Sequence, residues 1–194
     1  MEGVARGAFV AAVGKLDLVS RWMTPFLRVS GESAPRRAIE RFLAPFLATG
    51  KPTTLQLMGD DPEKIAATAR AAAQCGIAGI NLNCGCPSNR VVRHRAGGAI
   101  LADTQKIGRI AQRVKEEIGG LPFSLKFRSG ERDWREIEKF LPGLAASPAV
   151  DMLFYHCRTV SEAYRDVIGR EERFRRCAEL AAGKPLVLNG DLDF

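Results

Sequence analysis

Apolar and polar residues alternate with a period of two in several short stretches of the chain. The clearest is Ile80 to Asn83, where Ile80 and Leu82 alternate with Asn81 and Asn83. This period is typical of a strand whose two faces lie in different surroundings. The pattern predicts six strands, at residues 22–29, 53–59, 80–83, 123–128, 152–156 and 185–190.

Between these strands, apolar residues recur at helical spacing, most clearly as Ile39, Phe42, Leu43 and Phe46. Such a stripe is typical of an amphipathic helix that covers a sheet. Aspartates and glycines supply start and stop signals, with Asp60 or Asp61 and then Asp103 as helix caps. Helices are predicted at residues 5–16, 35–48, 62–75, 104–118, 134–144 and 162–182.

The alternation of strand and helix predicts parallel βα units, which occur both in doubly wound sheets and in barrels. Polar side chains end nearly every strand, and a TIM barrel gathers all its strand ends around one mouth. A doubly wound sheet uses mainly its switch point. The prediction is therefore an incomplete (β/α)8 TIM barrel, with strands two to seven present. These strand-end residues are Gln56, Asn83, Lys126, His156 and Asn189.

Composition is that of a globular domain: 194 residues, 46% hydrophobic and 26% charged. No apolar run approaches the roughly 18–20 residues that span a bilayer, and no signal peptide is recognisable, so a cytoplasmic protein is expected. The five cysteines are odd in number and scattered, which argues against a disulfide framework. Cys84 and Cys86 lack the partners of a zinc site, so no metal is expected.

The chain carries a formal charge of +7 and a pI near 9.5. An excess of Lys and Arg favours a polyanionic partner, most commonly nucleic acid. Solvated basic faces explain the charge equally well before any motif is considered.

Cys86 lies between two strand breakers, Gly85 and Pro87, where the chain leaves the end of a strand. Chemistry in α/β enzymes is concentrated at such positions. Asn83-Cys84-Gly85-Cys86-Pro87, followed by Val91 and by Gly97-Gly98-Ala99, closely resembles the signature loop of the tRNA-dihydrouridine synthases. These are flavin enzymes that reduce uridine in tRNA.

The resemblance implies FMN as cofactor, NADPH or NADH as electron donor and tRNA as partner. In the family, reduced FMN delivers a hydride to C6 of uracil, and the cysteine that matches Cys86 gives a proton to C5. The thiol must then be protonated when substrate binds, unlike a cysteine nucleophile. The alternative is a small buried hydrophobe, which is the interpretation preferred for Cys84.

Cofactor positions also follow from the resemblance. Gln56 would bond the pyrimidine edge of the flavin through a paired donor and acceptor, and the ammonium of Lys126 would stabilise the reduced flavin. A solvated strand-end lysine is the alternative, against which the flanking Leu125 and Phe127 argue. The full set of cofactor positions is Met1, Gln56, Lys126, His156, Asn189 and Gly190.

Substrate positions implied by the resemblance lie on strand ends and loops. The arginines that follow Cys86 are suited to phosphates beside a uracil that must be unstacked, or they only solvate a loop. Cys157 stands where the family has a glycine, and Asn81 is either a partner of Asn83 or a satisfied polar residue lower in the barrel. The substrate set is Asn83, Arg90, Arg93, Arg95, Arg158, Tyr164 and Arg165.

Residues 1–194 are expected to form a partial FMN-binding catalytic barrel, without its first and last strands and without a C-terminal tRNA-binding helical domain. Weak or no FMN binding is expected of this chain, because the family's glycine-rich phosphate loop follows the eighth strand. A monomer is expected. Two other functions remain open: a flavin barrel acting on a free pyrimidine or dihydroorotate, and a non-catalytic truncated RNA-binding remnant.

Overall fold

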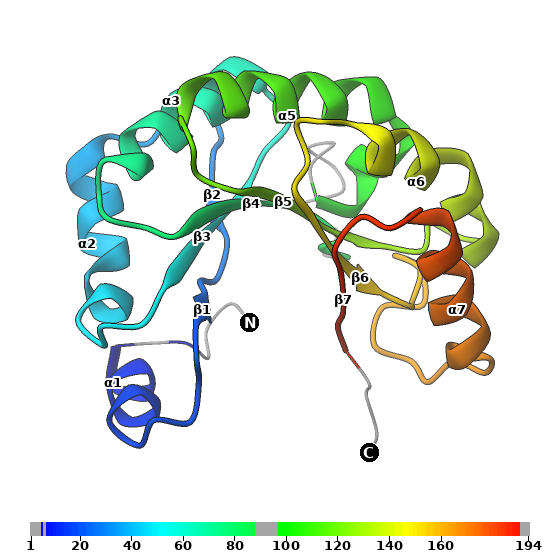
Figure 1. Ribbon diagram of the computed structural model, residues 1–194, viewed down its shortest axis with the longest axis horizontal. Helices are drawn as coiled ribbons and strands as arrows, with labels where there is room; N and C mark the ends of the chain where they lie inside the picture. Colours follow the sequence, from blue (N-terminus) through cyan, green and yellow to red (C-terminus); the bar gives the residue numbers. More distant parts are fainter. Residues whose placement is uncertain (1–4, 6, 88–96, 191–194) are drawn as a thin grey trace.

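Residues 5, 7–87 and 97–190 are described by the structure, a computed structural model (Figure 1). Parallel strands form a curved sheet, and helices cover its convex face. In chain order the elements are α1 (Gly7–Lys15), β1 (Trp22–Met23), β2 (Leu27–Arg28), α2 (Arg36–Leu47), β3 (Thr53–Met58), α3 (Pro62–Ala73), β4 (Gly79–Cys84), the 3-10 helix η1 (Gly97–Ala102), α5 (Thr104–Glu117), β5 (Phe123–Arg128), η2 (Trp134–Glu136), α6 (Ile137–Ala146), β6 (Met152–His156), α7 (Arg170–Leu180) and β7 (Leu186–Leu188).

The strand order distinguishes a barrel from a doubly wound sheet. Over the described residues the order is β1-β3-β4-β5-β6-β7, so sheet neighbours follow the order of the chain, and every pairing is parallel. A doubly wound sheet reverses direction at its switch point, whereas a barrel winds in one direction. The predicted fold class is confirmed as a curled part of a TIM barrel.

The first predicted strand, 22–29, is present in two pieces. Both β1 and β2 pair in parallel with β3, at Trp22↔Thr53 and Leu27↔Leu57. Pro25 lies between them and cannot donate to a ladder, so the strand is interrupted at this residue.

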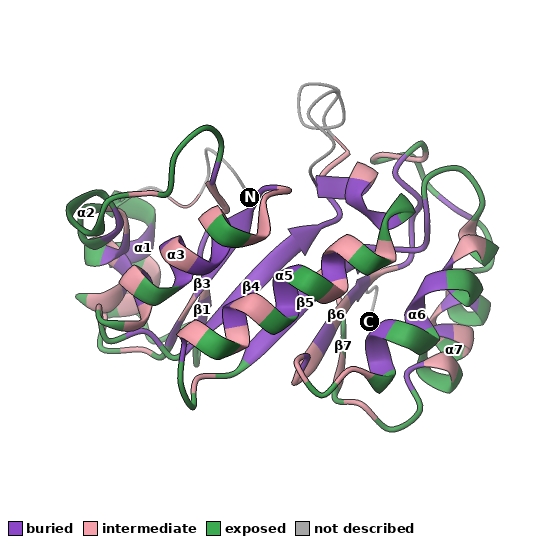
Figure 2. Cartoon of the chain, turned by 90° about the horizontal axis from the view of Figure 1, so that it is seen from above, coloured by how far each residue is buried: buried purple, intermediate pink, exposed green. Residues whose placement is uncertain are grey.

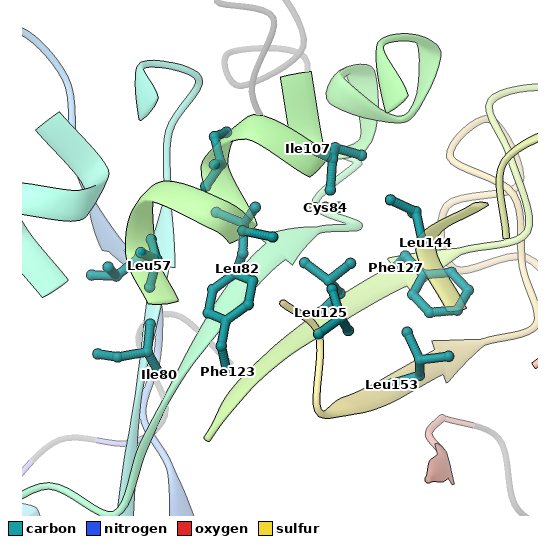
Figure 3. Close-up of a cluster of buried hydrophobic side chains, with 14 of the residues drawn as sticks. Leu57, Ile80, Leu82, Cys84, Ile107, Phe123, Leu125, Phe127, Leu144 and Leu153 are labelled. Carbon is teal, nitrogen blue, oxygen red and sulfur yellow. The ribbon is translucent and has the colours of Figure 1, made fainter. Parts of the chain in front are cut away.

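Side-chain alternation sorts each strand into an outer apolar face and an inner face. On β4, Ile80, Leu82 and Cys84 are buried toward the helices. Figure 3 shows them in a cluster with residues from the neighbouring strands and from α5. Figure 2 shows the buried strands beneath α3 and α5, whose exposed sides face outward. This layer holds the sheet and helices together through apolar burial.

Helix α3 begins where its cap was predicted. The side chain of Asp61 accepts hydrogen bonds from the N–H groups of Glu63, at 3.0 Å, and Lys64, at 3.2 Å, and Pro62 occupies the first turn. Asp103 caps α5 in the same way, accepting from Lys106 N–H at 2.9 Å.

The predicted helix over 162–182 is wrong in its first eight residues. Helix α7 begins only at Arg170, directly after Gly169, which has a positive φ of 75°. Glu162 is instead part of a loop, where its carboxylate accepts the N–H of Thr159 and both terminal nitrogens of Arg173. These tertiary bonds outweigh the local helical preference of the segment.

Leu82 tests the importance of the layer between sheet and helices. Leu82→Ala is expected to lower the free energy of unfolding by about 2–5 kcal/mol, because Leu82 is fully buried and the cavity cannot close. Urea unfolding followed by circular dichroism measures the loss. The control Leu18→Ala removes a leucine that is 67% exposed and is expected to cost less than about 0.5 kcal/mol. Equal losses in the two variants would contradict the assignment of this layer as the core.

Candidate functional site

The inner face of the sheet is polar across three adjacent strands. TIM-barrel interiors are usually filled by branched apolar side chains, so a polar inner face needs a reason. The register pairs Gln56 with Asn81 and Asn83 with Lys126, which places their side chains beside one another on this face. The inner positions of β3, β4 and β5 are Thr54, Gln56, Met58, Gly79, Asn81, Asn83, Ser124, Lys126 and Arg128.

Gln56 is tied to its neighbours through both ends of its amide. Its Nε2 donates to Asn81 Oδ1 at 2.8 Å and to Met23 Sδ at 3.2 Å, and its Oε1 accepts from Asn83 Nδ2 at 2.9 Å. Both hydrogens of Nε2 are engaged, so Oε1 is the atom of Gln56 that retains capacity for a ligand. A paired donor and acceptor facing a ligand would need Asn83 to supply the donor.

The loop that carries Cys86 is anchored at consecutive backbone groups. Gly85 N–H donates to Asn83 Oδ1 at 3.0 Å, and Arg128 Nε donates to Gly85 C=O at 2.8 Å. Cys86 C=O accepts from Gly98 N–H at 3.0 Å. A Cβ on Gly98 would lie only 2.4 Å from Cγ2 of Val160, so this close approach requires glycine.

The half-buried side chain of Cys86 packs with Phe26 against Met58. Met58 follows Gln56 by two residues on the same strand, so it lies on the same inner face. The thiol is therefore on the side of the sheet that carries Gln56 and Lys126. Cys84, by contrast, is buried in the outer layer, and burial raises the pKa of its thiol well above the usual range.

Lys126 is a nearly buried cation. Burial, together with the positive charge of Arg128, lowers the pKa of its ammonium from 10.5 to about 8, and the charge of a thiolate on Cys86 acts in the opposite direction. No hydrogen bond or carboxylate of the described residues compensates the ammonium. Burying a charge without a partner is costly, so the position fits an anionic or electron-rich ligand.

His156, Asn189 and Gly190 lie together at the ends of β6 and β7. A Cβ on Gly190 would lie 2.4 Å from His156 Nε2, and Gly190 has a positive φ of 80°, so glycine is required on both grounds. Asn189 N–H donates to Tyr155 C=O at 2.8 Å. Three predicted cofactor residues are thus adjacent.

The loop after β6 contains the predicted substrate residues Arg158, Tyr164 and Arg165. Arg158 is buried and its Nε donates to Arg165 C=O at 2.5 Å. Tyr164 is 76% exposed, and the Arg128 guanidinium lies 6.0 Å from its ring centroid. Tyr164 and Arg165 are therefore exposed, whereas Arg158 is buried.

A bidentate ion pair that the sequence did not suggest braces this loop. Arg173 Nη1 and Nη2 donate to the two carboxylate oxygens of Glu162 at 2.8 and 3.0 Å, and Nη1 also reaches Cys157 C=O at 3.0 Å. Partial burial raises the pKa of Glu162, but the hydrogen bonds from Arg173 and Thr159 outweigh it and lower the pKa to about 2. Both partners fell inside one predicted helix, which concealed the pair.

Cys157 fits the position where the family has glycine. Its side chain is fully buried in the outer core, and its φ is not among the positive values recorded for described non-glycine residues. The backbone therefore has no conformation there that only glycine would adopt. The remaining predicted residues, Met1, Arg90, Arg93 and Arg95, lie outside the described residues.

Lys126→Met is expected to stabilise the protein by roughly 1–3 kcal/mol at pH 7. The folded state holds the proton more weakly than the unfolded chain, so the cost is fully present below pH 8 and disappears as pH rises toward 10.5. Urea unfolding at several pH values from 7 to 10.5 measures this. The control Lys139→Met replaces an exposed lysine, and its stability difference from the parent protein should not change over this pH range. A less stable Lys126→Met variant at pH 7 would contradict the assignment.

Glu162→Gln is expected to lower stability at pH 7 by roughly 1–3 kcal/mol, because the largely buried Arg173 loses its countercharge. The depressed pKa of Glu162 stabilises the fold above pH 4.5, and this contribution is lost as pH falls toward 2. Thermal unfolding between pH 7 and pH 2.5 should therefore show a shallower acid dependence for the variant. Glu138→Gln, in the exposed pair with Arg176, is the control and should cost less than about 1 kcal/mol. An unchanged acid dependence in Glu162→Gln would refute the role of the pair.

Solved structures with a similar fold include morphinone reductase in complex with tetrahydroNAD, with a TM-score of 0.60 at 11% identity, covering 95% of this chain and 71% of that one. The old yellow enzyme homologue from Zymomonas mobilis has a TM-score of 0.59 at 13% identity, covering 89% and 69%. These likenesses support the fold. In the described part of the chain, no helix has the length and apolar character to cross a membrane.

Curated relatives are more similar in sequence. The tRNA-dihydrouridine(16) synthase of Ralstonia nicotianae is 31% identical over 198 residues, which cover 99% of this chain and 60% of the relative. That of Cupriavidus necator is 32% identical over 176 residues, which cover 88% and 54%. The chain thus spans little more than half the length of these relatives. The family model described as "Dihydrouridine synthase (Dus)" matches residues 10–193, and the chain therefore belongs to the dihydrouridine synthase family.

Proposed function

We propose that residues 1–194 form part of the catalytic barrel of an enzyme that reduces uridine to 5,6-dihydrouridine in tRNA, with FMN as cofactor and NADPH or NADH as electron donor. The observation that carries the proposal is the half-buried thiol of Cys86 on the same face as Lys126, whose ammonium has no compensating group among the residues that the structure describes. The names of the relatives support uridine 16 as the position, and such a substrate implies a cytoplasmic protein.

The residues present fit a flavin. Lys126 is a nearly buried cation without a compensating group among the described side chains, and Gln56 Oε1 and Asn83 have unused hydrogen-bonding capacity on the same face. The ammonium of Lys126 would hold the electron-rich edge of the flavin, and His156, Asn189 and Gly190 would hold the cofactor from β6 and β7. When bound, FMN supplies the hydride for C6 of uracil.

Cys86 supplies the proton. In the proposed step the S–H bond breaks, a C–H bond forms at C5 of uracil, and the thiolate left behind takes a proton from solvent. The charge of Lys126 interacts favourably with that thiolate. Partial exposure of Cys86 gives solvent access for reprotonation, and the anchored backbone keeps the sulfur in place between turnovers.

Recognition of tRNA is the second half of the proposal. A uracil in folded tRNA must be unstacked before it can reach a barrel mouth, and contacts with neighbouring phosphates and bases offset that cost. The net charge of +7 and the exposed ring of Tyr164 support this role, together with Arg165 and with Arg90, Arg93 and Arg95. Arg158 is buried and would support this loop through its hydrogen bond to Arg165 C=O.

Cys86→Ala is expected to reduce dihydrouridine formation by about 10²- to 10⁴-fold, the usual contribution of a general acid. The protein would be expressed in cells that lack their own dihydrouridine synthases, and dihydrouridine in purified tRNA measured by mass spectrometry of nucleosides. Cys75→Ala removes another half-buried thiol, which lies just after α3 and donates to Ala71 C=O, and should leave formation unchanged.

Three outcomes would overturn the proposal. Undiminished dihydrouridine in Cys86→Ala would exclude the thiol as proton donor. Reduction of free uracil, or turnover of dihydroorotate, without reduction of tRNA would indicate an enzyme that acts on a small molecule. Binding of tRNA in a gel shift, with no product even when FMN and NADPH are added in excess, would indicate a non-catalytic RNA-binding protein.

A further inference from the structure

We propose that Asn81 and Ser124, which the proposed reaction does not use directly, are positioning residues. They fix which way the amides of Gln56 and Asn83 point, and through them they hold the peptide that precedes Cys86. The importance of these residues for catalysis rests on the proposed function. The series of hydrogen bonds that links the four side chains, the relay, is present in the fold and does not depend on that function.

The upper part of the relay starts at the loop. Gly85 N–H donates to Asn83 Oδ1 at 3.0 Å, Asn83 Nδ2 donates to Gln56 Oε1 at 2.9 Å, and Gln56 Nε2 donates to Asn81 Oδ1 at 2.8 Å. Each side chain accepts from the one above and donates to the one below.

The lower part continues in the same direction. Asn81 Nδ2 donates to Ser124 Oγ at 2.9 Å, and the Ser124 hydroxyl donates to Ile80 C=O at 3.3 Å. Five consecutive hydrogen bonds thus connect the loop of Cys86 to the backbone deeper in the sheet, through three strands.

The two ends of the relay determine the orientation of every amide in it. A backbone N–H can only donate and a backbone carbonyl can only accept, whereas an amide side chain can be turned over with little change in shape. Gly85 N–H requires the oxygen of Asn83 to face it, and Ile80 C=O requires the hydroxyl hydrogen of Ser124. Both requirements are met by one orientation of the amides between them.

Burial restricts the amides of the relay to this one orientation. Asn81 is fully buried, and Gln56, Asn83 and Ser124 are nearly so. A buried amide with an unpaired end is costly, so the members of the relay turn over together or not at all. Without the hydroxyl of Ser124, Asn81 Nδ2 has no partner, and the reversed orientation becomes accessible. That orientation would present Asn83 Nδ2, a donor, to Gly85 N–H and break the turn before Cys86.

The test compares Ser124→Ala with Thr68→Val. Both remove a buried hydroxyl that accepts one hydrogen bond and donates another, but Thr68 lies on α3, where it bonds Ala34 N–H and Lys64 C=O. In ¹⁵N-labelled protein without flavin or tRNA, Ser124→Ala is expected to shift the Gly85 amide resonance and speed its hydrogen exchange by roughly 5- to 10-fold, the factor that one net hydrogen bond is worth. Thr68→Val should leave both unchanged, and Ser124→Thr, which keeps a hydroxyl, should restore them.

Alkylation of Cys86 by iodoacetamide gives a second measurement, expected to quicken severalfold in Ser124→Ala relative to Thr68→Val. If Ser124→Ala does not fold, Asn81→Asp carries the test, because an ionised carboxylate has no hydrogen to donate to Ser124. Equal behaviour of Gly85 in Ser124→Ala and Thr68→Val would overturn the inference. That result would leave the proposed function standing, since Cys86→Ala tests it independently in tRNA.

Discussion

The guanidinium of Arg128 joins the two loops on which the candidate site depends. It donates to Gly85 C=O after β4, and to Thr159 C=O and Ala163 C=O after β6, at 2.8 to 2.9 Å. The side chain is buried, so these carbonyls supply the polar contacts that water would otherwise provide. A rigid fork of donors suits this task, and a lysine could not hold three carbonyls in the same geometry. The loop of the thiol and the loop of Tyr164 are therefore not independent.

Much of the architecture could be predicted from local pattern. The alternation of Ile80–Asn83 is typical of a strand between a helix layer and a barrel interior. Asp61 and Asp103 cap their helices by accepting hydrogen bonds from backbone N–H groups no more than three residues away. The segment 162–169 could not be predicted, because its conformation depends on Glu162 reaching Arg173, eleven positions away on another element. Local propensity favours a helix there, and tertiary bonding overrides it.

The candidate site could likewise be predicted only in part from the sequence. The positions of Gln56, Asn83 and Lys126 on neighbouring strands follow from a barrel fold, since strand ends meet at one mouth. The partners of Gln56 do not, because they depend on the register of β3 with β4 and of β4 with β5. The polar character of Ser124 was visible in the alternation of β5, but its link to Asn81 required the paired strands.

The hydrogen bond between Gly98 N–H and Cys86 C=O has a consequence for how the sulfur is held in place. It joins the loop of Cys86 to η1, and the close approach of Gly98 to Val160 joins η1 in turn to the loop after β6. A side chain at position 98 would clash with Val160 and disturb both attachments. The thiol can therefore be displaced by a substitution twelve positions along the chain, even though its own residue is unchanged.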